Sequence, residues 1–283
     1  MTEPTVGKIL ELIALGFGTG AYGTLIGAGG GFVLMPLLLL LFPREGPEVL
    51  TSISLAVVFF NALAGSESYA MMKRIDYRAG SLFALATIPG AILGALGTSH
   101  VPRHLFDLIF GIILMAGAIF LFLHPDMDKR TGADPPTRQL GLSTHHLTSA
   151  DGTHYDYTFR PLVGVVASFF IGYASSFLGI GGGIIHVPVL IYLLHFPGHV
   201  ATATSHFILA IMAFTGTAVH VVDGSFAHGM IRTLGLGIGV VLGAPFGAHL
   251  SSHIRSGWIV RGLALALSLA GIRILIAVFE GKG

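Results

Sequence analysis

Two glycine-rich stretches of this sequence decide the fold that it predicts: LIGAGGGFVLMPLL at residues 25–38 and FLGIGGGIIHVPVL at residues 177–190. Each contains a Gly-x-Gly-Gly-Gly run with a proline five residues after its last glycine, and the two runs lie 152 residues apart. Glycine has more backbone freedom than any other residue and readily adopts positive φ angles. Each run therefore predicts a break between two apolar segments of the chain.

The apolar segments on either side of the first run cannot form one straight helix. Together they would reach about 50 Å, whereas the hydrocarbon core of a bilayer is about 30 Å thick. The chain must therefore turn back at the glycines. The same reasoning along the whole sequence predicts these helical segments: 8–26, 32–42, 48–72, 78–99 and 103–124 in the first half, and 159–178, 184–196, 199–222, 227–252 and 256–279 in the second.

The composition agrees with a chain that lies mostly in a membrane. Hydrophobic residues make up 53% of the 283 residues and charged residues only 10%, with a mean hydropathy of +0.81. A soluble domain carries about 25% charged residues. The net charge of +1 argues against a nucleic-acid partner, and the lack of cysteine excludes disulfides and thiolate metal sites. We predict an all-α polytopic membrane protein with no metal site and no cofactor.

The sequence also repeats itself outside the glycine runs. Thr51-Ser52 recurs as Thr204-Ser205, and the Gly-Ala-x-x-Gly-Ala motif at 90–95 recurs at 243–248, both at an offset of 153 residues. We interpret residues 1–124 and 159–283 as homologous transmembrane repeats, each with about four full helices plus a short or broken one. Residues 125–158 are read as a polar extramembrane linker, disordered in part. Duplicated halves are typical of secondary transporters, whose site lies between the repeats.

Basic residues predict how the two halves are oriented. Lys73, Arg74 and Arg78 lie in one loop, and the linker is also basic, so both are expected on the cytoplasmic side. Five crossings per half would then make the two repeats inverted. If each glycine hairpin only dips into the membrane, the parity changes, and the choice between four and five crossings stays open.

The repeated blocks resemble a known family. The two glycine-rich stretches, together with VATATSHF at 200–207 and GAPFGAHL at 243–250, are similar to the sulfite exporter TauE/SafE family, also called the toluenesulfonate uptake permease family. The resemblance covers nearly the whole chain except the linker. It implies a multi-pass protein of the cytoplasmic membrane that transports sulfite, organosulfonates or related small sulfur-containing anions. It does not imply which anion, in which direction, or with which coupling ion.

The candidate site follows from what an anion needs in the middle of a bilayer. A cationic side chain is costly there, whereas the free N–H groups at a helix start offer partial positive charge at less cost. Hydroxyl groups can donate further hydrogen bonds. The residues expected to bind substrate on this basis are Gly29, Gly30, Gly31, Thr51, Ser52, Gly181, Gly182, Gly183, Thr204 and Ser205. The alternative is that the glycines only allow close helix packing and the hydroxyls bond to their own helices.

Two histidines in the second half have no counterpart in the first. His186 aligns with Leu34, and His206 aligns with Ile53. A protonated imidazole could pair with an anion and carry a coupling proton, so both join the candidate site. The alternative is a neutral imidazole bonded to a nearby carbonyl. Asn61 and Thr215 are weaker candidates for substrate contact.

These observations predict a secondary transporter that works by alternating access between its repeats. A carrier for another oxyanion or a carboxylate, or an anion channel, remains open as an alternative. An enzyme is not expected, because no paired nucleophile and base is evident. The partners expected are the small anion and the lipid bilayer, with no nucleic acid, and a homodimer is left open.

Overall fold

The computed structural model describes residues 6–123, 142–251 and 256–280. The first half contains α1 (Val6–Ile26), α2 (Gly31–Leu41), α3 (Pro47–Met71), α4 (Tyr77–Thr98) and α5 (Arg103–Leu123). A hairpin of β1 (Ser143–Thr148) and β2 (His154–Phe159) follows. The second half contains α6 (Pro161–Leu178), α7 (Gly183–Pro188), the π-helical turn η1 (Val189–Leu193), α8 (Gly198–Val222), the 3-10 turn η2 (Ser225–Gly229), α9 (Met230–Leu250) and α10 (Ser256–Phe279).

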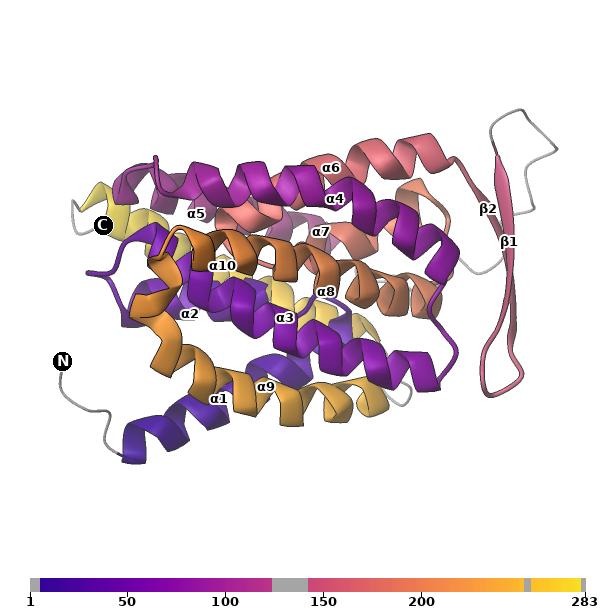
Figure 1. Ribbon diagram of the computed structural model, residues 1–283, viewed down its shortest axis with the longest axis horizontal. Coiled ribbons are helices and arrows are strands. Elements are labelled where there is room, and N and C mark those ends of the chain that lie inside the picture. Colours follow the sequence, from indigo (N-terminus) through magenta and orange to yellow (C-terminus); the bar gives the residue numbers. More distant parts are fainter. Residues whose placement is uncertain (1–5, 124–141, 252–255, 281–283) are drawn as a thin grey trace.

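Within the described residues, seven helices are long and apolar enough to cross a membrane. The segment after each glycine run is shorter, since α2 has 11 residues and α7 has six before the π-helical turn. The predicted all-α polytopic membrane fold is therefore confirmed, and so is a short or broken helix after each run. The helices lie roughly side by side in one bundle (Figure 1).

The two halves pack against each other through helix pairs that take one helix from each half. Helix α1 packs along α9, and α4 packs along α6, each pair running in the same direction. The repeated Gly-Ala-x-x-Gly-Ala motifs make these contacts close. A Cβ atom on Gly94 would lie 2.2 Å from the carbonyl oxygen of Tyr173, and one on Gly247 would lie 2.0 Å from that of Ala21. Small residues permit this approach between membrane helices.

The remaining two pairs run antiparallel. Gly216 lies beside Leu55 and Gly65 lies beside His206, so α3 and α8 cross in opposite directions in the middle of the bundle. Helices α5 and α10 also pair in opposite directions, with Gly111 beside Leu275. The corresponding helices of the two halves, α3 with α8 and α5 with α10, therefore run in opposite directions, as they would in two inverted copies of one repeat. The duplication itself stays a prediction.

The predicted linker contains regular structure. Residues 124–141 lie outside the described residues, but in the rest of the linker β1 and β2 pair antiparallel from Ser143↔Phe159 to Thr148↔His154. The first helix of the second half was predicted to begin at about residue 159. In the structure Phe159 ends β2 and α6 begins at Pro161. Proline suits the first turn of a helix, where its missing N–H is not needed.

The hairpin lies across one end of the bundle (Figure 1) and is fixed there by one carboxylate. Asp76 caps α4, since its Oδ1 accepts from the amide of Ala79 at 3.0 Å. Its Oδ2 accepts from the hydroxyl of Tyr157 at 2.5 Å and also contacts Nδ1 of His145. Burial, and then the charge of Asp76, raise the pKa of Tyr157 above its ordinary value, so the phenol remains the donor.

Aromatic packing holds the same strand against the bundle. The rings of Tyr157 and Phe159 lie 4.6 and 4.9 Å from the ring of Phe196, which follows η1. Phe83 of α4 completes the group, 5.9 Å from Phe159. Buried aromatic pairs of this kind add about 0.5–1.5 kcal/mol beyond their burial. The hairpin is therefore a packed part of the fold.

The turn of the hairpin contacts the loop between α3 and α4. Arg74 pairs with Asp151 at 3.3 Å, and the amide of Ala150 donates to the carbonyl of Met72 at 2.9 Å. The basic loop and the hairpin therefore share one end of the bundle, as the sequence predicted. The Ser149 hydroxyl and Thr153 hold the pKa of Asp151 well below its usual range. The ion pair of Asp151 with Arg74 is thus present at neutral pH and is lost only when strong acid protonates Asp151.

Candidate functional site

The two glycine runs, far apart in the sequence, touch each other inside the bundle. A Cβ atom on Gly31 would lie 2.6 Å from the carbonyl oxygen of Ile180. A Cβ atom on Gly183 would lie 2.4 Å from Cα of Ala28 and 2.7 Å from the carbonyl oxygen of Gly27. Glycine is therefore required at both contacts. The structure brings the six predicted glycines together at the interface of the two halves.

The two loops also share one backbone shape. Positive φ angles occur at the same three positions of each run: Gly27, Gly29 and Gly30 in the first, and Gly179, Gly181 and Gly182 in the second. A side chain in this region costs about 1–2 kcal/mol per residue. The last glycine of each run then starts a short helix, α2 or α7. The first amides of such a helix have no carbonyl partner within it.

One face of α3 contacts both loops. Ser54 donates its hydroxyl to the carbonyl of Gly179 in the second loop at 2.5 Å. Val58 packs against glycines of both loops. Asn61 lies on the first loop, where its Nδ2 is 3.8 Å from the position of a Cβ on Gly30. Spacings of three and four residues place these side chains on one helix face.

A matching face of α8 contacts the first loop. The methyl group of Thr202 lies 2.6 Å from the position of a Cβ on Gly27, and a methyl group of Leu209 lies 2.3 Å from that of Gly29. His206 lies between them on the same face and is fully buried. The two crossing helices α3 and α8 therefore enclose the loops.

A buried polar cluster joins the first loop to His206. The Thr24 hydroxyl donates to Oδ1 of Asn61 at 3.2 Å, and the Tyr69 hydroxyl donates to the carbonyl of Thr24 at 2.9 Å. The Tyr69 ring meets the His206 ring edge-on, with 5.4 Å between centroids. Sequence reasoning missed Thr24 and Tyr69, although Tyr69 follows Asn61 at two helical turns and shares its face.

Three buried polar atoms that touch the loops have no hydrogen-bond partner among the described residues. They are Thr51 Oγ1 beside Gly179, Asn61 Nδ2 beside Gly30 and Ser175 Oγ beside Gly182. An unsatisfied buried group costs about 1–3 kcal/mol, and folded proteins keep few of them. Ser66, Ser176, Ser205 and the ring nitrogens of His206 are also buried without such a partner. Unpartnered donors at both glycine loops are what a site for a polar ligand needs.

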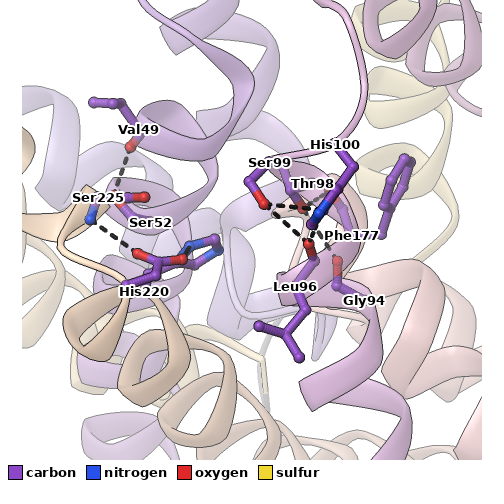
Figure 2. A network of polar contacts seen from close by, with 11 residues as sticks. Val49, Ser52, Gly94, Leu96, Thr98, Ser99, His100, Phe177, His220 and Ser225 are labelled. Atoms are coloured by element: carbon purple, nitrogen blue, oxygen red, sulfur yellow. Dashed lines mark hydrogen bonds and ion pairs between the residues drawn. The ribbon is translucent and has the colours of Figure 1, made fainter.

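The four predicted hydroxyls do not form one group. Thr51 lies beside Gly179, in the second loop. Ser52 instead donates to the carbonyl of Val49 at 2.7 Å, in its own helix (Figure 2). Thr204 accepts from the amide of Asp76 at 3.0 Å, where α4 begins. The hydroxyls of Ser52 and Thr204 therefore have structural partners.

The two predicted histidines differ in their surroundings. Nε2 of His186 lies 3.2 Å from the hydroxyl of Ser168, a contact between α7 and α6. His206 makes no hydrogen bond of normal geometry with the described residues and faces Gly65 and Tyr69. The described part of the chain holds no group of three His, Cys, Asp or Glu residues that could bind a metal. The arrangement offers neutral donors and one titratable ring to a ligand.

Comparisons with known proteins agree with one another. A model of the family described as sulfite exporter TauE/SafE matches residues 12–274. The chain is 30% identical over 276 residues to "Probable membrane transporter protein YunE" of Bacillus subtilis (strain 168), covering 95% of this chain and 97% of that protein. It is 28% identical over 272 residues to a "Probable membrane transporter protein" of Xylella fastidiosa (strain 9a5c), covering 92% and 95%. No solved structure matches.

Proposed function

The chain belongs to the sulfite exporter TauE/SafE family of multi-pass membrane proteins, and from that premise we propose that it is a secondary transporter for small sulfur-containing anions. Its substrate would be sulfite or an organosulfonate, carried across the cytoplasmic membrane. The observation that carries this proposal is the contact between the two glycine loops at the interface of the halves.

The chemistry of the loops supports an anionic substrate. The first loop ends at the start of the 11-residue helix α2, where the first N–H groups lack partners within the helix and the helix dipole favours negative charge. The glycines of the loop place no side chain of their own in front of these groups. Such donors attract sulfonate and sulfite oxygens without the cost of a cationic side chain at mid-membrane. They attract a carboxylate by the same means, so the family supplies the preference for sulfur.

The pairing of helices from different halves supports alternating access. Because α1 packs on α9 and α4 packs on α6, each peripheral pair takes one helix from each half. The antiparallel helices α3 and α8 carry the residues that touch the loops. Rocking of these units against each other would expose the loops first to one side of the membrane and then to the other. The energy source would be an ion gradient or downhill flow.

Flux through proteoliposomes tests the proposal. The purified protein should take up labelled sulfite or sulfoacetate with saturable kinetics, and unlabelled anion on the far side should accelerate exchange. Acetate and malonate serve as matched carboxylates. If only the carboxylates are taken up, the substrate is a carboxylate and the proposed sulfur-containing anion is wrong. Flux that neither saturates nor shows exchange would indicate an anion channel and overturn the carrier mechanism.

His206 gives a prediction about the coupling ion. We expect His206→Gln to flatten the dependence of transport on pH, because glutamine keeps a polar side chain but cannot be protonated. The exposed His100, which follows α4 and bonds to the carbonyl of Leu96 near the end of that helix, provides the control variant His100→Gln. The pH profile should be measured from initial rates at constant substrate. A profile identical to wild type would exclude His206 as the proton carrier.

A further inference from the structure

The side chain of Asn61, beside the first glycine loop, has a hydrogen-bond donor that no neighbouring group in the described part of the chain accepts. It lies in the middle of α3 and is fully buried. Its Oδ1 accepts the hydroxyl of Thr24 at 3.2 Å, and this bond fixes which way the amide faces. Its Nδ2 is then directed toward Gly30, 3.8 Å from the position that a Cβ atom would take there. Nδ2 has no hydrogen-bond partner among the described residues.

The same point is the start of α2. Gly30 is the N-cap residue of this 11-residue helix, and no side chain caps it. The first amides of a helix lack carbonyl partners within the helix, so they add donors beside Nδ2. A side chain at position 30 would occupy the space between Asn61 and α1, where the Thr19 carbonyl oxygen lies 2.7 Å from the Cβ position. Glycine is therefore required at position 30, because the backbone of α1 leaves no room for a Cβ atom there.

The second half has no equivalent of this side chain. At the repeat offset of 153 residues, Asn61 corresponds to Phe214, which is 57% exposed on the outer face of α8. Thr215, the next residue, donates its hydroxyl to the carbonyl of Ile211 in its own helix. The side-chain amide donor is therefore present at one loop only, so the two loops are chemically unequal.

We propose that Nδ2 of Asn61 and the first amides of α2 together bind the oxygen atoms of the transported anion at the first glycine loop. This inference rests on the proposed function and specifies its site. The substrate class is a small anion with at least two acceptor oxygens on one centre, as in sulfite and sulfonates. Thr24 is a positioning residue, because it holds Oδ1 of Asn61 and so keeps the donor turned toward the loop.

The test measures anion binding to the purified full-length protein by thermal shift. Wild type, Asn61→Leu, Asn61→Asp and the control Thr217→Val should be titrated with sulfite, thiosulfate, sulfoacetate and acetate, since a bound anion raises the melting temperature. The Thr217 hydroxyl donates to the carbonyl of Ala213 in its own helix. Asn61→Leu keeps the size and removes the donor, whereas Asn61→Asp replaces the donor with an acceptor. We expect both Asn61 variants to bind the preferred anion about 10- to 100-fold more weakly, and Thr217→Val to match wild type.

The outcomes separate this inference from the function on which it rests. Anion binding by wild type with unchanged affinity in Asn61→Leu would overturn the role of Asn61 and leave the transporter proposal intact. No binding of any tested anion to wild type would overturn both. If Asn61→Asp does not fold, Asn61→Leu alone still decides.

Thr24 provides an independent readout. Thr24→Val removes the hydroxyl and lets the Asn61 amide turn, so we expect binding about three- to tenfold weaker than in wild type. Thr24→Ser restores the hydroxyl and should recover wild-type affinity. Failure of serine to recover the affinity that valine loses would show that Thr24 contributes only packing.

Discussion

Replacing Gly183 by alanine is expected to reduce transport to background. Gly183 has an ordinary helical backbone, so alanine adds no φ strain, and the effect comes from one methyl group. That methyl group would lie 2.4 Å from Cα of Ala28 and 2.7 Å from the carbonyl oxygen of Gly27. These are backbone atoms, and they cannot rotate away as a side chain would. The two loops must therefore separate, and overpacking of this kind costs about 1–3 kcal/mol.

The measurement is initial uptake in proteoliposomes, normalised to the amount of folded protein after size-exclusion chromatography. Gly18→Ala is the matched control, since a Cβ on this α1 glycine would meet no atom within 4 Å. It should transport at the wild-type rate. Wild-type uptake by Gly183→Ala would show that contact between the loops is not needed, and would remove the main support for the site.

The second large effect is expected for Asp76→Ala, which should weaken the docking of the hairpin on the helix bundle. Alanine removes the N-cap of α4, which costs about 0.5–2 kcal/mol. It also leaves the buried Tyr157 hydroxyl and the His145 ring without their acceptor, at about 1–3 kcal/mol for each group. We expect a destabilisation of about 2–5 kcal/mol after partial relaxation, concentrated in the hairpin.

Limited proteolysis combined with thermal melting measures this effect. The hairpin of Asp76→Ala should be cleaved much faster than that of wild type, and the melting temperature should fall. Asp76→Asn retains an oxygen for the Ala79 amide and should recover part of the loss. Asp151→Ala removes the exposed ion pair with Arg74 and the contacts of this carboxylate with Ser149 and Thr153 in the hairpin turn, and should have a smaller effect. Equal cleavage of Asp76→Ala and wild type would mean that the aromatic contacts alone dock the hairpin.

The helices could be predicted closely from the sequence because each signal is physical and local. An apolar segment of about 20 residues must form a helix in lipid, and a glycine run must break it. The hairpin was missed because its strands are short and depend on distant partners. HYDYTF at 154–159 alternates aromatic with polar residues over only six positions, and it is held by partners far away in the sequence, such as Asp76 and Phe196.

The candidate site could be predicted only in part. The glycines were found because the repeat marks them, and their contact follows from the packing of the halves. The Thr51-Ser52 pair could not act as a unit, because neighbouring residues on a helix point about 100° apart. Only Thr51 lies at a loop, while Ser52 bonds within its helix. The face of α3 that contacts the loops runs through Ser54, Val58 and Asn61, and identifying it required the positions of the two loops.

The pairing of helices from different halves has a consequence for biogenesis. Helix α1 leaves the ribosome first, yet its packing partner α9 is made about 200 residues later. At roughly 5–20 residues per second, α1 must wait in the membrane for tens of seconds with its glycine face unpaired. Neither half can complete its own packing, so each should be recognised as unassembled by membrane quality control. Co-expression of the two halves as separate chains should restore a stable protein that neither half yields alone.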